Sequence, residues 1–286
     1  MLRRQSARFV YRPDVGGIRD PWATAIGVGG LQTAKAHNMT MLPVRGVPML
    51  DNYVSDPVDE ALAALAAIEV PRGVYKPQED SRLLLAAMAG LGMVQGRRVL
   101  DLCTGSGVLA VAAARLGAAE VVAYDISPKA VQCTLDNAEV QGLVVDARLG
   151  SLEEALEAGP FDLVVSNPPY VPADRLSTAS VGLAHSWHGG RDGRTLLDPL
   201  CVAGPELLAD DGTIMIVQSE FADTESSLVE LRAGGLNADV VARERIPFGP
   251  VLMQNARWLE SLGMLEPGCR EEELVVVRAH KAAGGR

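Results

Sequence analysis

Short apolar runs and helical patterns alternate along the last two thirds of the chain. The apolar runs, rich in Val, Leu and Ile, cover residues 98–102, 121–125, 147–149, 161–166, 213–218, 239–243 and 274–278. Helical spacing of apolar residues falls between most of them, near residues 107–116, 128–140, 194–209 and 222–234. Apolar strands that alternate with helices are typical of a largely parallel sheet covered on both faces. The pattern therefore predicts an α/β fold on a seven-stranded, mostly parallel, Rossmann-like sheet.

Two further helices are predicted before the sheet. Asp56 suits an N-cap and Pro57 suits the first helical position, and apolar residues then follow at helical spacing as far as Ile68. Another helical pattern follows Pro77 and ends near residues 90–92. We therefore expect residues 56–96 to form N-terminal helices that lie over the ligand site of a domain at residues 97–281.

The 286-residue chain has a net charge of −10, and this charge is unevenly distributed. Residues 1–40 hold six basic and two acidic residues, a net charge of +4, which leaves −14 for the rest. Residues 1–55 show no clear period and are predicted to be a leader or extension, either weakly structured or folded as an arm over the substrate cleft. Residues 282–286 form a short tail. The acidity argues against sequence-independent binding of nucleic acid, which depends on neutralising phosphates.

Cysteine and apolar content indicate a cytoplasmic protein without membrane segments. The four cysteines are far apart and form no CxxC pair, which is typical of reduced cytosolic proteins. No apolar run in the sequence reaches the roughly 18 residues of a membrane span. His185 and His188 have HxxH spacing, but no Cys or carboxylate accompanies them at ligand spacing. We therefore expect no metal site.

A glycine loop follows the first strand of the predicted sheet. The segment reads Asp101-Leu-Cys-Thr-Gly-Ser-Gly107, and Gly105 and Gly107 would let the backbone approach a ligand at the carboxyl edge. Asp125 ends the second strand, where a carboxylate can accept hydrogen bonds from both ribose hydroxyls. A dinucleotide or S-adenosylmethionine would fit. Because Asp101 would repel a pyrophosphate, the loop favours S-adenosylmethionine.

Each acid of this predicted site has an alternative role. Asp101 could help to hold the cationic methionine end of the cofactor, or it could cap the loop. Asp125 could bind ribose, or cap the helix that begins after Ser127. At the adenine end an acid is common in such proteins, but this chain has Ser151, so its hydroxyl or backbone would serve. Thr104 and Ile126, beside the loop and beside Asp125, complete this side.

The fourth strand ends in Asn167-Pro168-Pro169-Tyr170. A residue before proline is held extended, and prolines expose carbonyls without matching N–H donors. The Asn167 side-chain oxygen and the Pro168 carbonyl would then form a rigid pair of acceptors for a planar NH2 group, on which the Tyr170 ring could stack. Such acceptors stabilise the positive charge that develops on nitrogen as a methyl group arrives. The segment therefore predicts N-methylation, with catalysis mainly by positioning.

Four segments together resemble the class I S-adenosylmethionine-dependent methyltransferases, and in particular the HemK family of protein glutamine N5-methyltransferases. They are residues 73–81, 101–107, 167–170 and 189–194, and the first is similar to the HemK2-like short branch. By this resemblance the glycine loop would line the cofactor, and the Asn-Pro-Pro-Tyr turn would hold the target amide. Residues 189–194 would shape the substrate side and cap the next helix. The residues that would lie over the methionine end are Pro77, Glu79, Asp80 and Ser81.

The resemblance implies transfer of a methyl group to a glutamine side-chain amide of a protein such as a translation release factor. The resemblance does not indicate which activating subunit, if any, the protein uses. Amino methylation of a nucleobase in RNA or DNA, or of a small-molecule metabolite, is the alternative. Residues 1–70, and the long stretch that includes residues 248–253, depart from the short branch and could reshape the substrate cleft.

Overall fold

The computed structural model describes residues 56–173 and 189–281. Within these ranges seven strands form one sheet, in the order β3-β2-β1-β4-β5-β7-β6. Strand β7 is antiparallel to both of its neighbours, whereas the other pairs are parallel. The strands are β1 Arg98–Leu102, β2 Glu120–Asp125, β3 Asp146–Leu149, β4 Phe161–Ser166, β5 Leu208–Ser219, β6 Leu236–Pro247 and β7 Glu271–Lys281. The predicted seven-stranded, mostly parallel sheet is confirmed.

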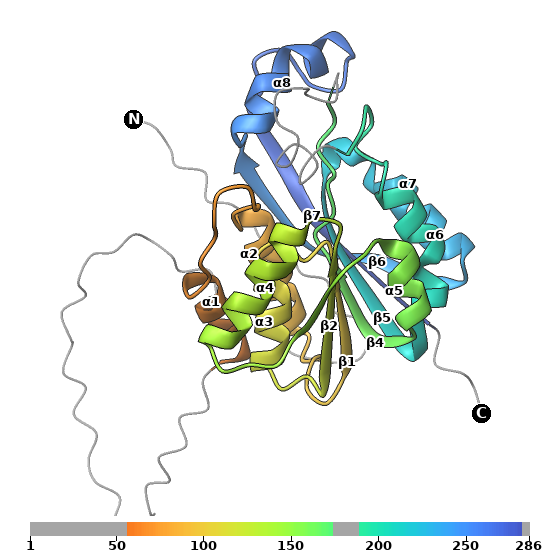
Figure 1. The fold of residues 1–286 in the computed structure, drawn as a ribbon. Helices are drawn as coiled ribbons and strands as arrows, with labels where there is room; N and C mark the ends of the chain where they lie inside the picture. Colours follow the sequence, from red (N-terminus) through yellow and green to blue (C-terminus); the bar gives the residue numbers. More distant parts are fainter. Residues whose placement is uncertain (1–55, 174–188, 282–286) are drawn as a thin grey trace, which may run out of the picture.

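Helices cover both faces of the sheet, and the ribbon in Figure 1 shows the two layers. One layer contains α1 Pro57–Ala66, α2 Glu79–Gly90, α3 Val108–Arg115 and α4 Pro128–Val140. The other contains α5 Leu152–Ala158, α6 Leu197–Leu207 and α7 Thr224–Ala233. Because both faces are covered, central strands such as β1 and β4 are buried along almost their whole length.

The N-terminal helices belong to the same hydrophobic core as the sheet. Asp56 Oδ1 accepts a hydrogen bond from the Val58 amide at 2.9 Å, as expected for the N-cap. Helix α2 is buried almost throughout, with its leucines in the same apolar cluster as strands β1 and β4. Asn137 of α4 fixes the connection between α1 and α2, because its side chain bonds both the amide and the carbonyl of Glu69 at 2.9 Å. The segment that precedes the sheet is therefore held tightly against it.

Two helices lie in segments for which no helix was predicted. Helix α5 begins at a capping box, in which Ser151 and Glu154 satisfy each other's backbone amides. Helix α8, Pro250–Ser261, occupies the long connection between β6 and β7 and lies beyond the end of that strand pair (Figure 1). Its buried residues Leu252, Ala256 and Leu259 recur at i, i+4 and i+7, which is helical spacing. Helix α6 begins at Leu197, three residues later than predicted.

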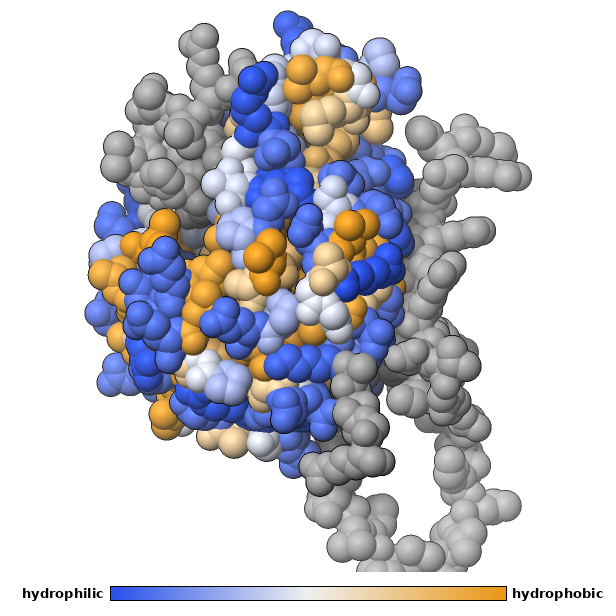
Figure 2. Space-filling model, turned by 90° about the vertical axis from the view of Figure 1, so that its right-hand side faces the viewer, coloured by the Kyte–Doolittle hydropathy of each residue, from blue (hydrophilic) through white to orange (hydrophobic). Residues whose placement is uncertain are grey.

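The face over α5, α6 and α7 is polar with scattered apolar patches. Figure 2 views the molecule from this side and shows separate hydrophobic patches among hydrophilic side chains. Val202 of α6 and Val229 of α7 are exposed apolar residues of these helices. No helix in residues 56–173 and 189–281 is long and apolar enough to cross a membrane. The predicted leader, the tail and the His185–His188 pair lie outside the described residues.

Candidate active site

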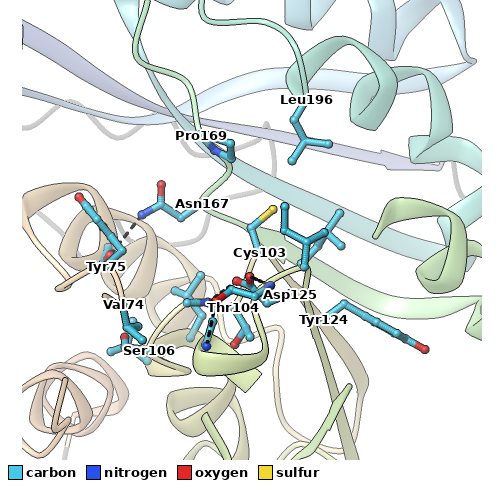
Figure 3. Close-up of a pocket in the computed structure, with 18 of the residues that line it drawn as sticks. Val74, Tyr75, Cys103, Thr104, Ser106, Tyr124, Asp125, Asn167, Pro169 and Leu196 are labelled. Carbon is cyan, nitrogen blue, oxygen red and sulfur yellow. Dashed lines mark hydrogen bonds between the residues drawn. The ribbon is translucent and has the colours of Figure 1, made fainter. Parts of the chain in front are cut away.

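A cavity of about 310 Å³ opens where the carboxyl ends of β1, β2 and β4 meet. Helix α2 and the segment before it form its other wall. Figure 3 shows side chains from these elements converging on the cavity. The predicted site residues that line it are Pro77, Ser81, Thr104, Gly105, Asp125, Ile126, Ser151, Asn167 and Pro169. The fold therefore brings most of the predicted site together from five separate segments of chain.

Glycine is required at the two loop positions for different structural reasons. Gly105 lines the cavity with φ +56°, and a Cβ there would approach only the Cys103 carbonyl, at 3.9 Å. Gly107 has φ +80°, and a Cβ there would lie 2.8 Å from the Thr134 side chain of α4. Gly105 thus leaves room for a ligand, whereas Gly107 permits α3 and α4 to pack closely. That Gly107 also touches the cofactor stays a prediction.

Asp125 stands at the end of β2 and faces the cavity. Its Oδ2 accepts a hydrogen bond from the Gly105 amide at 3.0 Å, and its Oδ1 accepts one from the Ser127 amide at 2.9 Å. Burial raises the pKa of this carboxyl, and the two amide bonds oppose that shift. Each oxygen keeps a further acceptor site for a ligand hydroxyl. Asp125 thus anchors the loop and the start of α4 while it still faces the cavity.

Asp101 lies behind the loop. It is fully buried, and its Oδ2 accepts hydrogen bonds from Thr104 Oγ1 at 2.7 Å and from the Ala110 amide at 3.0 Å. Burial raises the pKa of this carboxyl to about 7. Its Oδ1 is buried with no hydrogen-bond partner among the described residues. This geometry corresponds to the loop-capping alternative, and the contact with the methionine end stays a prediction.

The end of the cavity that is predicted to hold adenine is largely apolar. Ile126 is 65% exposed beside Asp125, and Tyr124, Gly150 and Leu152 also line this end. Ser151 is present as predicted, but its hydroxyl donates to Glu154 Oε2 at 2.6 Å within the capping box. A planar base could therefore lie against Ile126 and Leu152, with the Ser151 hydroxyl partly committed to the start of α5.

The Asn-Pro-Pro-Tyr turn places its residues on different sides. Asn167 and Pro169 are half-buried and line the cavity, while Pro168 and Tyr170 are buried. Asn167 Nδ2 donates a hydrogen bond to Ser81 Oγ of α2 at 3.2 Å, marked by a dashed line in Figure 3. No hydrogen bond within the described residues uses Asn167 Oδ1, so this oxygen is available to a ligand. The pairing of Oδ1 with the Pro168 carbonyl stays a prediction.

Tyr170 and Asp80 lie behind this turn rather than in the cavity. Asp80 is buried, and its Oδ2 accepts hydrogen bonds from Tyr75 Oη at 2.8 Å and from Tyr170 Oη at 3.1 Å. Burial first, and then the charge of Asp80, raise the pKa of both tyrosines, so each hydroxyl keeps its proton. Stacking of Tyr170 on the target group stays a prediction. So does contact of Asp80 with the methionine end.

A second cavity, of about 370 Å³, adjoins the first along Val74 and Tyr75. Glu79, Asp80 and Tyr170 line it on one side, and the start of α8 with Ile246 and Leu274 lines it on the other. Glu272 of β7 is 5% exposed there, and burial raises its pKa to about 7. Its Oε2 has no hydrogen-bond partner among the described residues. This cavity thus combines apolar walls with buried carboxyls.

Residues 189–194 support the chain segment that follows β4. The Gly189 amide donates to the Val171 carbonyl at 3.0 Å, and the Ala173 amide donates to the Gly190 carbonyl at 2.9 Å. A Cβ on Gly193 would lie 2.3 Å from the Tyr170 carbonyl. Arg194 is buried and bonds the carbonyls of Ala222 and Asp223, which precede α7. The segment therefore holds the turn against the second helical layer.

Sequence reasoning missed several residues that line the cavities. Tyr75 lies within a quoted motif, but its link to Asp80 could have been suspected only from their spacing of five residues. Leu196 and Glu272 carried no signal, because neither residue lies within one of the motifs. Cys103 also lines the first cavity, and burial raises the pKa of its thiol, which argues against a nucleophile. The described residues contain no group of three or more metal-ligating side chains.

Sheet order, the antiparallel β7, the glycine loop after β1 and the acid at the end of β2 define a class I S-adenosylmethionine-dependent methyltransferase. A chain of the E. cuniculi Mtq2–Trm112 complex has a similar fold, with a TM-score of 0.50 and 21% identity over 73% of this chain and 99% of that one. The family model for the ribosomal protein L11 methyltransferases (PrmA) matches residues 82–169.

Curated relatives identify the family within this class of methyltransferases. The chain is 35% identical to mouse methyltransferase HEMK2 over 57% of this chain and 80% of that protein. It is 30% identical to the release factor glutamine methyltransferase of Mycolicibacterium smegmatis over 69% of this chain and 81% of that protein. It is 35% identical to the Deinococcus radiodurans enzyme of that name over 61% of this chain and 65% of that protein. The chain therefore belongs to the HemK family of protein glutamine N5-methyltransferases.

Proposed function

We propose that this enzyme transfers a methyl group from S-adenosylmethionine to the side-chain amide nitrogen of a glutamine in a protein, such as a translation release factor. The observation that carries the proposal is Asn167, which lines the cavity with its Nδ2 engaged by Ser81 and its Oδ1 available. An oxygen acceptor fixed at this place suits an NH2 group that attacks a methyl carbon.

The residues of the first cavity fit the cofactor. Asp125 keeps acceptor sites that suit the two ribose hydroxyls, and Gly105 adds no side chain where the ligand would lie. Ile126 and Leu152 offer apolar contact to a purine. When bound, S-adenosylmethionine supplies an electrophilic methyl group on a sulfonium.

The chain's own residues would act mainly by positioning. Asn167 Oδ1 would accept a hydrogen bond from the acceptor NH2, which turns the nitrogen lone pair toward the methyl carbon and stabilises the charge that develops there. As the N–C bond would form and the S–C bond break, the sulfur would keep the electron pair of the broken bond, and one proton would pass from the nitrogen to solvent.

The second cavity suits the polypeptide on either side of the target glutamine. It adjoins the first cavity at Tyr75, and its apolar wall comes from β6, β7 and α8. The buried Glu272 could accept a hydrogen bond from an N–H group of that polypeptide. A protein acceptor also agrees with the acidic charge of the chain and with the protein substrates in the names of its relatives.

The test is a transfer assay with labelled S-adenosylmethionine. Purified release factor, ribosomal proteins, bulk tRNA and rRNA, and a metabolite extract are each incubated with the full chain. We expect label in the release factor, at glutamine by mass spectrometry, and loss of label when that glutamine is replaced by alanine. Label confined to RNA or to metabolites would overturn the proposal.

A further inference from the structure

In the proposed reaction, the side-chain amide of Asn167 must present Oδ1, and not Nδ2, to the methyl acceptor. The structure contains contacts that select this orientation. An asparagine side chain can rotate by half a turn and exchange its oxygen and its NH2 group at little cost. Only one orientation presents Oδ1 to an acceptor amine. The other would present Nδ2, and two NH2 groups would then face each other without a hydrogen bond.

Ser81 is the contact that distinguishes these orientations. Its Oγ lies 3.2 Å from Asn167 Nδ2 and 3.2 Å from Asp80 Oδ1, and the serine is only 2% exposed. A carboxylate offers acceptors and no donor. The single hydroxyl hydrogen of Ser81 is therefore directed to Asp80, and toward Asn167 the oxygen presents a lone pair. A lone pair at this place selects the orientation in which Asn167 turns its NH2 to α2.

Asp80 is held as an acceptor by donors on every side. In addition to the Ser81 hydroxyl, it receives the Ser81 amide at 2.5 Å, Tyr75 Oη at 2.8 Å and Tyr170 Oη at 3.1 Å. Tyr75 Oη itself accepts from Gln78 Nε2 at 3.2 Å, so its own hydrogen is free for Asp80. Each of these partners supplies the hydrogen of its bond, and Asp80 acts as an acceptor toward the Ser81 hydroxyl as well.

From this chain of contacts we infer that Ser81 is a positioning residue, which Asp80 polarises so that Asn167 Oδ1 faces the methyl acceptor. The inference rests on the proposed function, because it concerns the orientation of the group that would bind the acceptor. It changes the expectation for Ser81 and Asp80, since both act here through the acceptor turn rather than through the methionine end of the cofactor.

The experiment compares Ser81→Ala with Ser81→Thr in the full-length enzyme. Loss of the hydroxyl leaves Asn167 free to rotate, so we expect kcat with release factor to fall about 10- to 100-fold in Ser81→Ala. Calorimetry should show cofactor Kd within about threefold of the native value. Threonine keeps a hydroxyl at the same place and should restore kcat to within a few-fold. Ser261→Ala, the same change at the exposed end of α8, is the matched control.

Coupling and orientation give two further readouts. If Ser81 acts through Asn167, Ser81→Ala should have little further effect in an Asn167→Ala background. In the native enzyme, NMR should show contacts from the Asn167 side-chain NH2 protons to the Ser81 β-protons, and Ser81→Ala should broaden those NH2 signals. Should alanine prevent folding, Ser81→Cys provides a similar shape with a weaker acceptor, and an intermediate kcat is expected.

Three results would overturn the inference. They are native kcat in Ser81→Ala, a cofactor Kd that rises in proportion to the loss of kcat, or effects of Ser81→Ala and Asn167→Ala that multiply. Failure of the proposed function is distinct, because the native enzyme would then show no transfer to glutamine at all. The NMR orientation of Asn167 can still be measured in that case.

Discussion

The proposed cofactor side of the cavity and its proposed acceptor side are built in different ways. On the cofactor side, main-chain groups shape the cavity. They are the loop after β1, with two glycines at positive φ, and the two main-chain amides that bond Asp125. On the acceptor side, side chains from distant segments are linked in series, from the tyrosines through Asp80 and Ser81 to Asn167. A backbone site tolerates change at most side chains, whereas a linked series fails when any member is lost.

Asn167→Ala should produce the largest effect and affect the acceptor side alone. Loss of one preorganised acceptor costs roughly 100- to 1,000-fold in kcat in comparable sites. Because Asn167 bonds no cofactor-side residue, cofactor Kd by calorimetry should change by no more than a few-fold. A large rise in Kd instead would place Asn167 on the cofactor side.

Gly107→Ala should disrupt the cofactor side through packing. A Cβ at φ +80° lies 2.8 Å from the Thr134 side chain, so α3 and α4 must move apart. We expect a loss of roughly 2–4 kcal/mol in the free energy of unfolding, measured with urea. Gly92→Ala is the matched control, since its φ is +62° but a Cβ there meets no atom within 4 Å. Equal losses in both variants would show that backbone strain alone, and no packing against Thr134, sets the cost.

Asp125→Ala tests whether the carboxylate binds the ligand or only organises the loop. Ribose hydroxyls left without a partner should weaken cofactor binding by about 1–3 kcal/mol. Acceptor KM at saturating cofactor should stay close to native, because Asp125 is remote from the linked side chains. Unchanged cofactor affinity together with lower thermal stability would assign Asp125 to the loop and the start of α4.

Glu272→Gln should have an effect similar in size to that of Asp125→Ala at high pH and almost none at low pH. The pKa of Glu272 is raised from 4.5 to about 7, so the folded state binds more protons than the unfolded state between these values. Its contribution to stability is therefore present below pH 4.5 and is lost as pH rises toward 7. We expect Glu272→Gln to be more stable than the native enzyme by on the order of 2 kcal/mol at pH 8, and about equal to it at pH 4.5.

Thermal unfolding across pH 4.5 to 8 is the measurement for this variant. Asp80 and Glu220 also act on Glu272, and both raise its pKa. A difference from the native enzyme that is constant across this range would mean that Glu272 does not titrate there.

Local patterns predicted the sheet and most of the cofactor side. This is because apolar periodicity and the conformation of glycine depend on residues that are close together in the chain. Gly105 and Asp125 lie 20 residues apart and are joined by one strand–helix–strand unit, so their meeting could be inferred. Helix α8 was missed although its buried residues Leu252, Ala256 and Leu259 have helical spacing, so this element was within reach of the sequence pattern. The cavity residues Leu196 and Glu272 were missed because no motif contains them.

The sequence by itself determined which groups stand at the carboxyl edge of the sheet. They are the glycine loop after β1, the acid at the end of β2 and the proline turn after β4. These depend on backbone preferences that each segment carries alone. Only the tertiary structure decided what Asp80, Ser81 and Tyr170 do. Tyr170 meets Asp80 across 90 residues of chain and Asn167 meets Ser81 across 86, and such pairings follow from how α2 packs on the sheet. The direction of a hydrogen bond between them depends on every neighbour at once, which no segment read alone contains.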